Sequence, residues 1–94
     1  MKLIDIKKIK ESEFSVTVTK EKVTRHTVFV SESTFSTFGN GKLTKEQLIK
    51  KSFLFLLQRE PQSSILQTFD LSEIANYFPE YENIANLGWI DVSG

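Results

Sequence analysis

The sequence predicts an α+β fold, in which a small antiparallel β-sheet comes first in the chain and helices follow it. Between residues 13 and 31, apolar residues alternate with polar ones, which is the period of half-buried strands. Between residues 45 and 59, apolar residues recur at helical spacing behind a strong helix start signal. Strands followed by helices are typical of α+β proteins, so we expect the helices to pack on one face of the sheet.

The first half of the chain predicts a β-hairpin. In residues 13–19, Phe14, Val16 and Val18 alternate with polar residues, and residues 23–31 form a second run that is rich in β-branched side chains. A polar connection of three residues joins the two runs, so we expect them to pair antiparallel. Residues 2–9 alternate less regularly and fit either a strand or a short ordered lead-in.

A loop is predicted over residues 33–41, which place two Phe and two Gly among polar residues. The capped helix over residues 45–59 follows it. Thr44 is the predicted N-cap, and Gln47 completes a capping box with it. Leu43 and Leu48 are spaced as the hydrophobic staple around this cap. Pro61 ends the helix, because it holds the residue before it out of helical geometry.

One or two short helices are predicted after residue 70. Asp70 and Glu73 are spaced as a second capping box, and Pro79 ends the helix that follows them. Residues 80–87 add a further turn or two, and Gly88 suits a helix C-terminus. Residues 89–92 predict an extended tail with apolar anchors.

The composition predicts a single domain over residues 1–94, with 39% hydrophobic and 26% charged residues. The chain has no cysteine, which excludes disulfides, thiol catalysis and thiolate zinc sites. The N-terminal residues carry frequent charges and no signal-peptide pattern. The longest apolar run, residues 53–57, is too short to cross a bilayer. We therefore expect a cytoplasmic protein that has no membrane partner.

The charge is distributed unevenly along the chain. Residues 1–51 carry eleven Lys or Arg against six Asp or Glu, whereas residues 52–94 carry one against six. Either the two halves attract each other in the fold or simply face water, or the surface has a basic pole and an acidic pole that steer charged partners.

The candidate binding residues surround the connection between the two predicted strands: Lys20, Lys22, Arg25 and His26. A basic strand face can contact phosphate groups. However, aromatic residues do not alternate with these charges as they do in a stacking platform for bases. His26 is the only histidine, and we expect it at the surface or rim of its strand.

No catalytic, metal or cofactor site is predicted. The run Gly39–Lys42 before a helix is similar to a phosphate-binding loop. It departs from the nucleotide-binding pattern at two positions, because Ser36 replaces the first glycine and Leu43 replaces the Ser or Thr that binds magnesium. We therefore expect no enzymatic activity.

The helix over residues 45–59 carries two apolar residues outside its main apolar face. On a helical wheel, Leu54 falls in the solvent arc and Phe55 at the edge of that arc. Both are candidate interface residues. Two coverings are open: the C-terminal half, with Ile65, Leu66 and Trp89, folds over them, or a second copy of the chain covers them in a two-fold dimer.

Several short runs in the second half of the chain are similar to a pattern in small uncharacterised bacterial α+β proteins: residues 43–49, 59–61, 69–71 and 77–81. The shared residues are mostly capping and core residues, so the resemblance implies a fold and no activity. The leading hypothesis is a small interaction or regulatory module that acts by protein–protein contact, either with another protein or with itself as a homodimer. The alternative is a nucleic-acid-associated protein that uses the basic N-terminal half.

Overall fold

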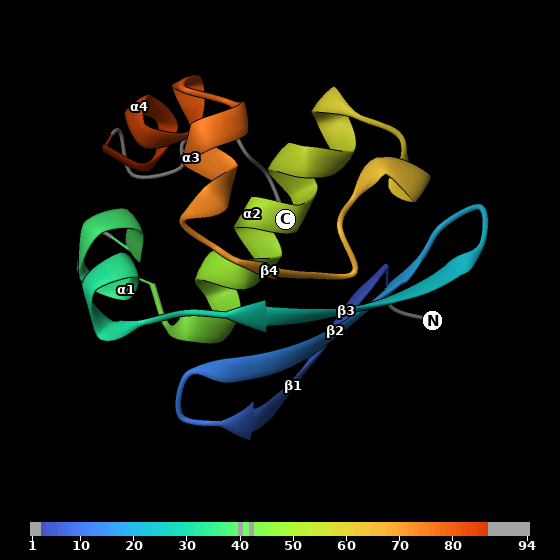
Figure 1. Cartoon of the computed structure of the whole chain (residues 1–94), viewed down its shortest axis with the longest axis horizontal. Helices are drawn as coiled ribbons and strands as arrows, with labels where there is room; N and C mark the ends of the chain where they lie inside the picture. The colour runs from blue at the N-terminus through green and yellow to red at the C-terminus, as the bar shows by residue number, and fades with distance from the viewer. Residues whose placement is uncertain (1–2, 40, 42, 87–94) are drawn as a thin grey trace.

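The computed structural model describes residues 3–39, 41 and 43–86. Figure 1 shows a sheet built mainly from the first half of the chain and helices packed against it, which confirms the α+β class. In chain order the elements are β1 (Ile4–Lys10), β2 (Glu13–Thr19), β3 (Val23–Phe29), α1 (Glu32–Gly39), α2 (Lys45–Arg59), the 3-10 turn η1 (Gln62–Ser64), β4 (Thr68–Asp70), α3 (Glu73–Tyr77) and α4 (Glu80–Asn86).

The sheet has the strand order β1-β2-β3-β4. The predicted hairpin is confirmed as β2 and β3, and residues 4–10 form a strand rather than a lead-in. The short strand β4 pairs parallel with β3, so the sheet is mixed and not wholly antiparallel. The sequence did not predict β4, because three residues are too few to show a period.

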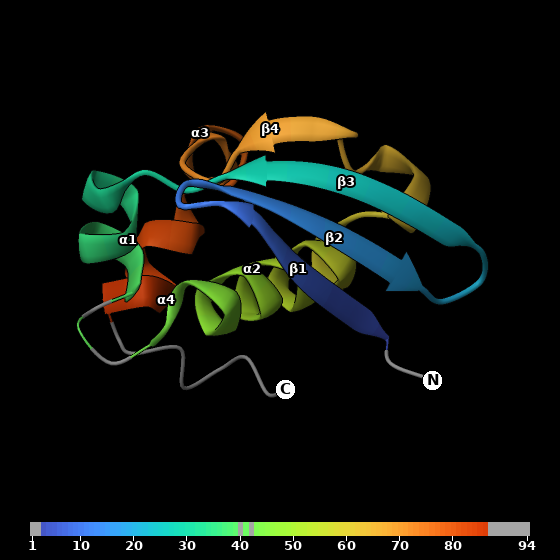
Figure 2. The ribbon, with the colours of Figure 1, turned by 90° about the horizontal axis from the view of Figure 1, so that it is seen from below.

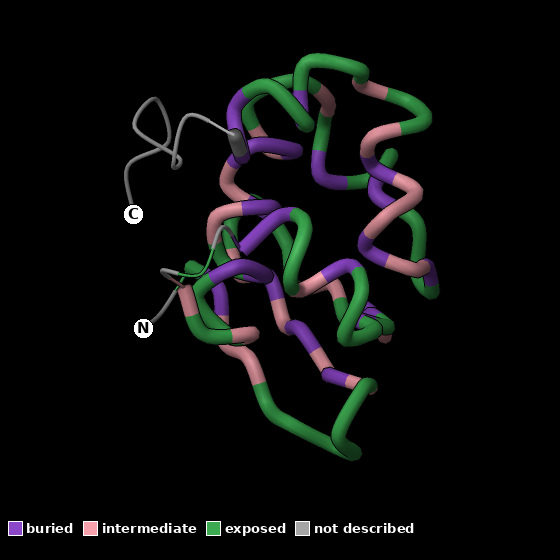
Figure 3. Tube along the Cα trace, turned by 90° about the vertical axis from the view of Figure 1, so that its left-hand side faces the viewer, coloured by how far each residue is buried: buried purple, intermediate pink, exposed green. Residues whose placement is uncertain are grey.

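The two faces of the sheet differ in burial. Along β2, Phe14, Val16 and Val18 are buried and the residues between them are half-buried, an alternation that can be followed along the tube in Figure 3. The helix α2 lies across the buried face, and no described helix covers the other face (Figure 2). That open face is polar on β2, where it carries Ser15 and Thr17.

The predicted bounds of α2 are confirmed by its caps. The Thr44 hydroxyl accepts a hydrogen bond from the Gln47 N–H at 3.1 Å, and the Gln47 side chain accepts one from the Thr44 N–H at 2.9 Å. At the other end Glu60 is extended, with φ −147°, immediately before Pro61. On the core side Ile49, Phe53 and Leu56 are buried, as the pattern predicts, whereas Leu57 is half-buried.

The predicted loop over residues 33–41 is wrong for most of its length, because residues 32–39 form α1. Ser31 begins this helix: its hydroxyl accepts a hydrogen bond from the Thr34 N–H at 3.1 Å. Phe38 then packs on Tyr81 of α4, with ring centroids 4.9 Å apart. Gly39 is the last residue of α1, and Gly41, with φ +68°, has the turn geometry that glycine favours. Asn40 and Lys42 lie outside the described residues.

The second capping box is half formed. The Asp70 N–H donates to the Glu73 carboxylate at 2.8 Å, but the Asp70 carboxylate accepts from the N–H and hydroxyl of Ser72. The helix α3 therefore begins at Glu73, and Pro79 separates it from α4. The predictions for Gly88 and residues 89–92 lie outside the described residues.

A buried hydrogen-bond chain fixes α4 to α2. The Tyr81 hydroxyl lies 2.7 Å from the Ser52 hydroxyl, and the Ser52 hydroxyl donates to the Leu48 carbonyl at 2.7 Å. Because Ser52 uses its single proton on that carbonyl, Tyr81 is the donor of the pair. Burial raises the pKa of Tyr81, so its phenol stays neutral at any physiological pH.

Among the described residues, no helix has the length and apolar character needed to cross a membrane.

Candidate functional site

The predicted basic residues do not form one cluster with His26. Lys20 and Lys22 are exposed at the β2–β3 turn, and Arg25 is exposed on the open face of the sheet. His26 points to the opposite face and is only 4% exposed. The expectation of a surface histidine is therefore wrong. The alternation of residues 23–31 contained the signal for this placement, because it puts His26 on the same face as Val28.

Both ring nitrogens of His26 have partners inside the protein. Nδ1 lies 2.7 Å from the Leu66 carbonyl, which only accepts, so Nδ1 carries the proton. Nε2 lies 3.0 Å from the Thr24 hydroxyl, and the ring meets Phe53 edge-on at 5.4 Å between centroids. The imidazole therefore fixes the segment before β4 to β3, and neither nitrogen is available to a ligand.

A buried glutamine supports the same junction. The Gln62 side-chain amide donates to the Lys22 carbonyl at 2.9 Å and to the Thr24 hydroxyl at 2.8 Å. It also approaches the Val18 carbonyl at 3.2 Å. These contacts hold η1 against the end of the hairpin. Nothing in the local sequence distinguishes Gln62 from a surface glutamine, so its role could not be predicted from the sequence.

Phe55 is fully buried, which removes it from the candidate interface. Its ring lies 5.3 Å from that of Tyr81 and 5.9 Å from that of Phe78, and the Arg59 guanidinium stacks on it at 3.7 Å. The C-terminal helices therefore cover Phe55 within the chain, as one of the two open coverings predicted. The ring contacts come from Phe78 and Tyr81, which were not among the predicted covering residues, and the predicted Trp89 lies outside the described residues.

Leu54 is half-buried and lines a groove of about 550 Å³ between β1 and α2. We call this the β1–α2 groove. Its apolar floor includes Ile4 and Ile6 of β1, and Lys50 stands on its rim. The helical wheel therefore identified an unusual position correctly, and among the described residues its neighbours across the groove belong to the first strand of the sheet.

The outer edge of β1 forms the other side of this groove. The Leu3 carbonyl accepts a hydrogen bond from the Thr19 N–H at 2.8 Å. Because hydrogen-bonding direction alternates along an antiparallel strand, the backbone groups of Leu3, Asp5 and Lys7 face β2. Those of Ile4, Ile6 and Lys8 then face the open edge, where no described strand pairs with them.

The charges along β1 are of two kinds. The Lys8 ammonium pairs with Glu11 at 3.2 Å, and this hydrogen bond and charge hold the pKa of Glu11 below its usual range. Asp5 and Lys7, by contrast, form no ion pair with any described residue. Two unlike charges therefore stand two residues apart on the open face of the edge strand.

No cluster of metal-ligating side chains occurs in the described part of the chain. The geometry therefore offers an edge strand, a groove and unpaired charges, which are features of a contact surface. Comparison with protein-family models, with curated proteins and with solved structures gives no match for this chain.

Proposed function

We propose that the chain is a protein–protein interaction module that associates with itself through the edge of β1. In this arrangement β1 pairs antiparallel with β1 of a second copy, and the sheet runs on through the dimer. The observation that carries the proposal is the open edge of β1 beside the β1–α2 groove. Added strands recognise such an edge through backbone hydrogen bonds and fill adjoining pockets with alternate side chains.

The charges of β1 favour one register of this pairing. In a two-fold antiparallel pair, opposite residues must have the same orientation, so the centre falls on a residue, and we compare the centres on Asp5, Ile6 and Lys7. Centring on Asp5 opposes two carboxylates, and centring on Lys7 opposes two ammonium groups. Centring on Ile6 places Asp5 opposite Lys7 of the second copy, twice by symmetry. Opposite charges across a strand pair contribute about 0.2–1 kcal/mol each, and like charges oppose pairing.

The same register satisfies the backbone at the open edge. Ile6 would exchange hydrogen bonds with Ile6 of the second copy, and Ile4 with Lys8, which are the residues whose backbone groups face outward. The inward side chains of the added strand would lie over the groove and cover Leu54. Lysines on edge strands discourage indiscriminate pairing. In β1, Lys7 also disfavours the register centred on itself, in which two lysines would lie opposite each other.

A charge swap tests the register. We expect Asp5→Lys to weaken the dimer at least about tenfold, because both Asp5–Lys7 attractions become repulsions. The double variant Asp5→Lys/Lys7→Asp restores unlike charges with the signs exchanged and should regain the wild-type dissociation constant. Sedimentation equilibrium at several protein concentrations measures both constants, and circular dichroism confirms that each variant is folded.

Three outcomes would contradict this proposal. A wild-type chain that stays monomeric at the highest soluble concentration has no such dimer. An Asp5→Lys variant with the wild-type dissociation constant rules out the register centred on Ile6. A folded double variant that remains as weak as Asp5→Lys shows that the two charges do not face each other.

A second candidate function is nucleic-acid binding, which is supported by the exposure of Lys20 and Lys22 at the β2–β3 turn and of Arg25 on the adjoining strand β3. Phosphate binding by these groups would give steeply salt-dependent retention on heparin or DNA. Reversing all three charges should then abolish retention without unfolding the domain. Retention that persists in this variant would remove the turn from consideration.

A further inference from the structure

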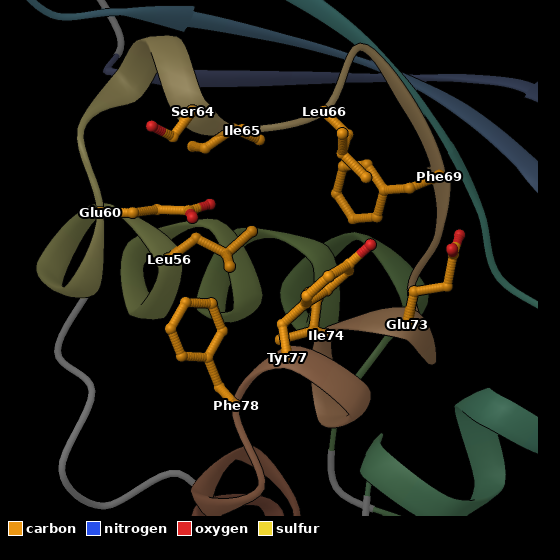
Figure 4. Close-up of a pocket in the computed structure, with 10 residues that line it drawn as sticks. All are labelled: Leu56, Glu60, Ser64, Ile65, Leu66, Phe69, Glu73, Ile74, Tyr77 and Phe78. Carbon is orange, nitrogen blue, oxygen red and sulfur yellow. The ribbon is translucent and has the colours of Figure 1, made fainter.

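A separate cavity of about 310 Å³ lies on the other side of α2 from the β1–α2 groove. It is enclosed by the end of α2, the segment from η1 to β4, and α3 (Figure 4). Its inner walls are apolar and include Leu56, Ile65, Phe69 and Ile74, of which each is buried. The volume falls at the lower end of the range for small-molecule pockets, roughly 300–1,000 Å³.

The mouth of the cavity carries two large side chains that are exposed to water. Leu66 is 48% exposed and Tyr77 is 66% exposed, and both line the cavity. An occupant would cover this apolar surface, which favours binding by about 25 cal/mol for each Å² removed from water.

The cavity holds one carboxylate that the fold does not use. Figure 4 shows the Glu60 side chain directed into the cavity, and it forms no ion pair or hydrogen bond with the described residues. Partial burial without a partner raises the pKa of Glu60. The other carboxylate of the lining, Glu73, is already engaged by the Asp70 N–H at 2.8 Å.

The surroundings of the cavity are acidic. Residues 52–86 contain one cation, Arg59, and the five acidic residues Glu60, Asp70, Glu73, Glu80 and Glu82. Arg59 pairs with Glu80 at 3.0 Å and stacks on Phe55, so it does not neutralise Glu60. The two charged residues that line the cavity, Glu60 and Glu73, are both acidic, which favours a cation over an anion there.

We propose that this cavity binds a small amphiphilic amine, whose ammonium group pairs with Glu60 and whose aromatic or branched aliphatic body packs between Phe69, Ile74 and Tyr77. An apolar cavity with a single convergent charge is the usual form of a small-molecule site. The amine supplies the positive charge that the partly buried carboxylate lacks, and its body replaces water against the apolar walls. This site is independent of the β1 edge.

Three probes of one shape and different charge test the proposal. Tryptamine carries an ammonium group, indole-3-propionate carries a carboxylate, and 3-methylindole is neutral. We expect tryptamine to bind and to shift the backbone amide resonances of residues around the cavity in a ¹⁵N-edited NMR titration. Indole-3-propionate should bind at least about tenfold more weakly, because its charge has the wrong sign.

The variant Glu60→Gln keeps the shape of the side chain and removes its charge, and Glu82→Gln is the matched control on an exposed position of α4. We expect Glu60→Gln to weaken tryptamine binding about tenfold and to leave 3-methylindole binding unchanged, whereas Glu82→Gln changes neither. The proposal fails if tryptamine causes no shifts up to millimolar concentration, or if it shifts resonances of the β1–α2 groove instead. It also fails if the anion binds as well as the cation, or if Glu60→Gln binds tryptamine like the wild type.

Discussion

At the scale of single residues, Glu60 and His26 show two ways of placing a polar group inside a small domain. His26 is buried but hydrogen-bonded at both nitrogens, so its burial costs little and its contacts fix the chain. Glu60 is half-buried without a partner, which opposes its ionisation. A residue that lowers stability in this way is often found at a binding site, because the features that make a site functional commonly reduce the stability of the fold.

The raised pKa of Glu60 predicts a pH-dependent effect of Glu60→Gln on stability. Burial raises the pKa of Glu60 in the folded state above its value in the unfolded state. The protonated carboxyl of Glu60 therefore gives its full contribution to stability below the unfolded pKa, and this contribution is lost as the pH rises through the folded pKa. The wild type should therefore melt below Glu60→Gln at about pH 7, while the two should melt alike at about pH 3.5, where the carboxyl is protonated.

Thermal unfolding followed by circular dichroism across this pH range measures the difference in Tm. Glu82→Gln is again the control, because Glu82 is exposed and should show no such trend. A Glu60→Gln variant that melts below the wild type at neutral pH would mean that the carboxylate has a stabilising partner.

At the scale of elements, the two longest helices differ in how their starts are encoded. The start of α2 is a complete capping box, with Thr44 and Gln47 bonded reciprocally. The start of α1 is a single serine cap followed by threonines and phenylalanines, which have modest helix propensity. α1 is stabilised by packing, since Phe38 lies against Tyr81 and Lys45 pairs with Glu32 at 2.9 Å. A local sequence pattern cannot predict contacts like these, which join α1 to residues outside it.

The capping box makes a direct prediction for Thr44→Ala. Losing an N-cap side chain of this kind costs about 1 kcal/mol of folding free energy, because the Gln47 N–H loses its acceptor. Urea unfolding of the two proteins should show a lower midpoint for the variant with an unchanged slope.

Thr37→Ala is the matched control, because Thr37 is exposed inside α1 and alanine has the higher helix propensity. We expect that change to be neutral or slightly stabilising. Equal midpoints for Thr44→Ala and the wild type would show that water replaces the cap without cost.

At the scale of the whole molecule, the sequence carries an excess of positive charge in one half and of negative charge in the other, and the ion pairs of the described residues do not join those halves. The ion pairs among the described residues join Lys8 and Lys45 to Glu11 and Glu32, or Arg59 to Glu80. Each therefore lies within one half of the chain. The basic half carries the β1 edge, and the acidic half supplies the two carboxylates that line the cavity, Glu60 and Glu73.

The proposed dimer also makes a prediction for Leu54→Lys. In a two-fold pair about β1, the helix layers of both copies lie on the same face of the sheet, so Leu54 faces the added strand across the β1–α2 groove. The added strand would cover an ammonium group at this position, and burying a charge is unfavourable even though Glu46 lines the groove as well as Lys50. We expect the variant to dissociate at least about tenfold more readily, as measured by light scattering over a concentration series.

Gln58→Lys adds the same charge at an exposed position of α2 outside the groove and should leave the dissociation constant unchanged. If both variants weaken the dimer equally, the effect is general repulsion. If Leu54→Lys lowers Tm but leaves the molar mass measured by light scattering unchanged, the role of Leu54 is confined to its own chain.

The sequence by itself determined the elements that carry their own local signals. Alternation predicted β2 and β3, and caps with a stopping proline predicted α2 to its bounds. The helical wheel also singled out Leu54, which lines the groove. These features depend on contacts between residues a few positions apart, so they can be read along the chain.

Only the tertiary structure decided which strand lies at the edge, which residues cover Phe55, and where β4 pairs. The parallel pairing of β4 with β3 joins residues 41 positions apart, such as Thr27 and Thr68, and no local period in the sequence predicts such a contact. Glu60 appears in the sequence only as the residue before a helix-stopping proline. It becomes a candidate ligand because Ile65, Phe69 and Ile74, which are brought back over the end of α2 by later turns of the chain, build apolar walls around its carboxylate.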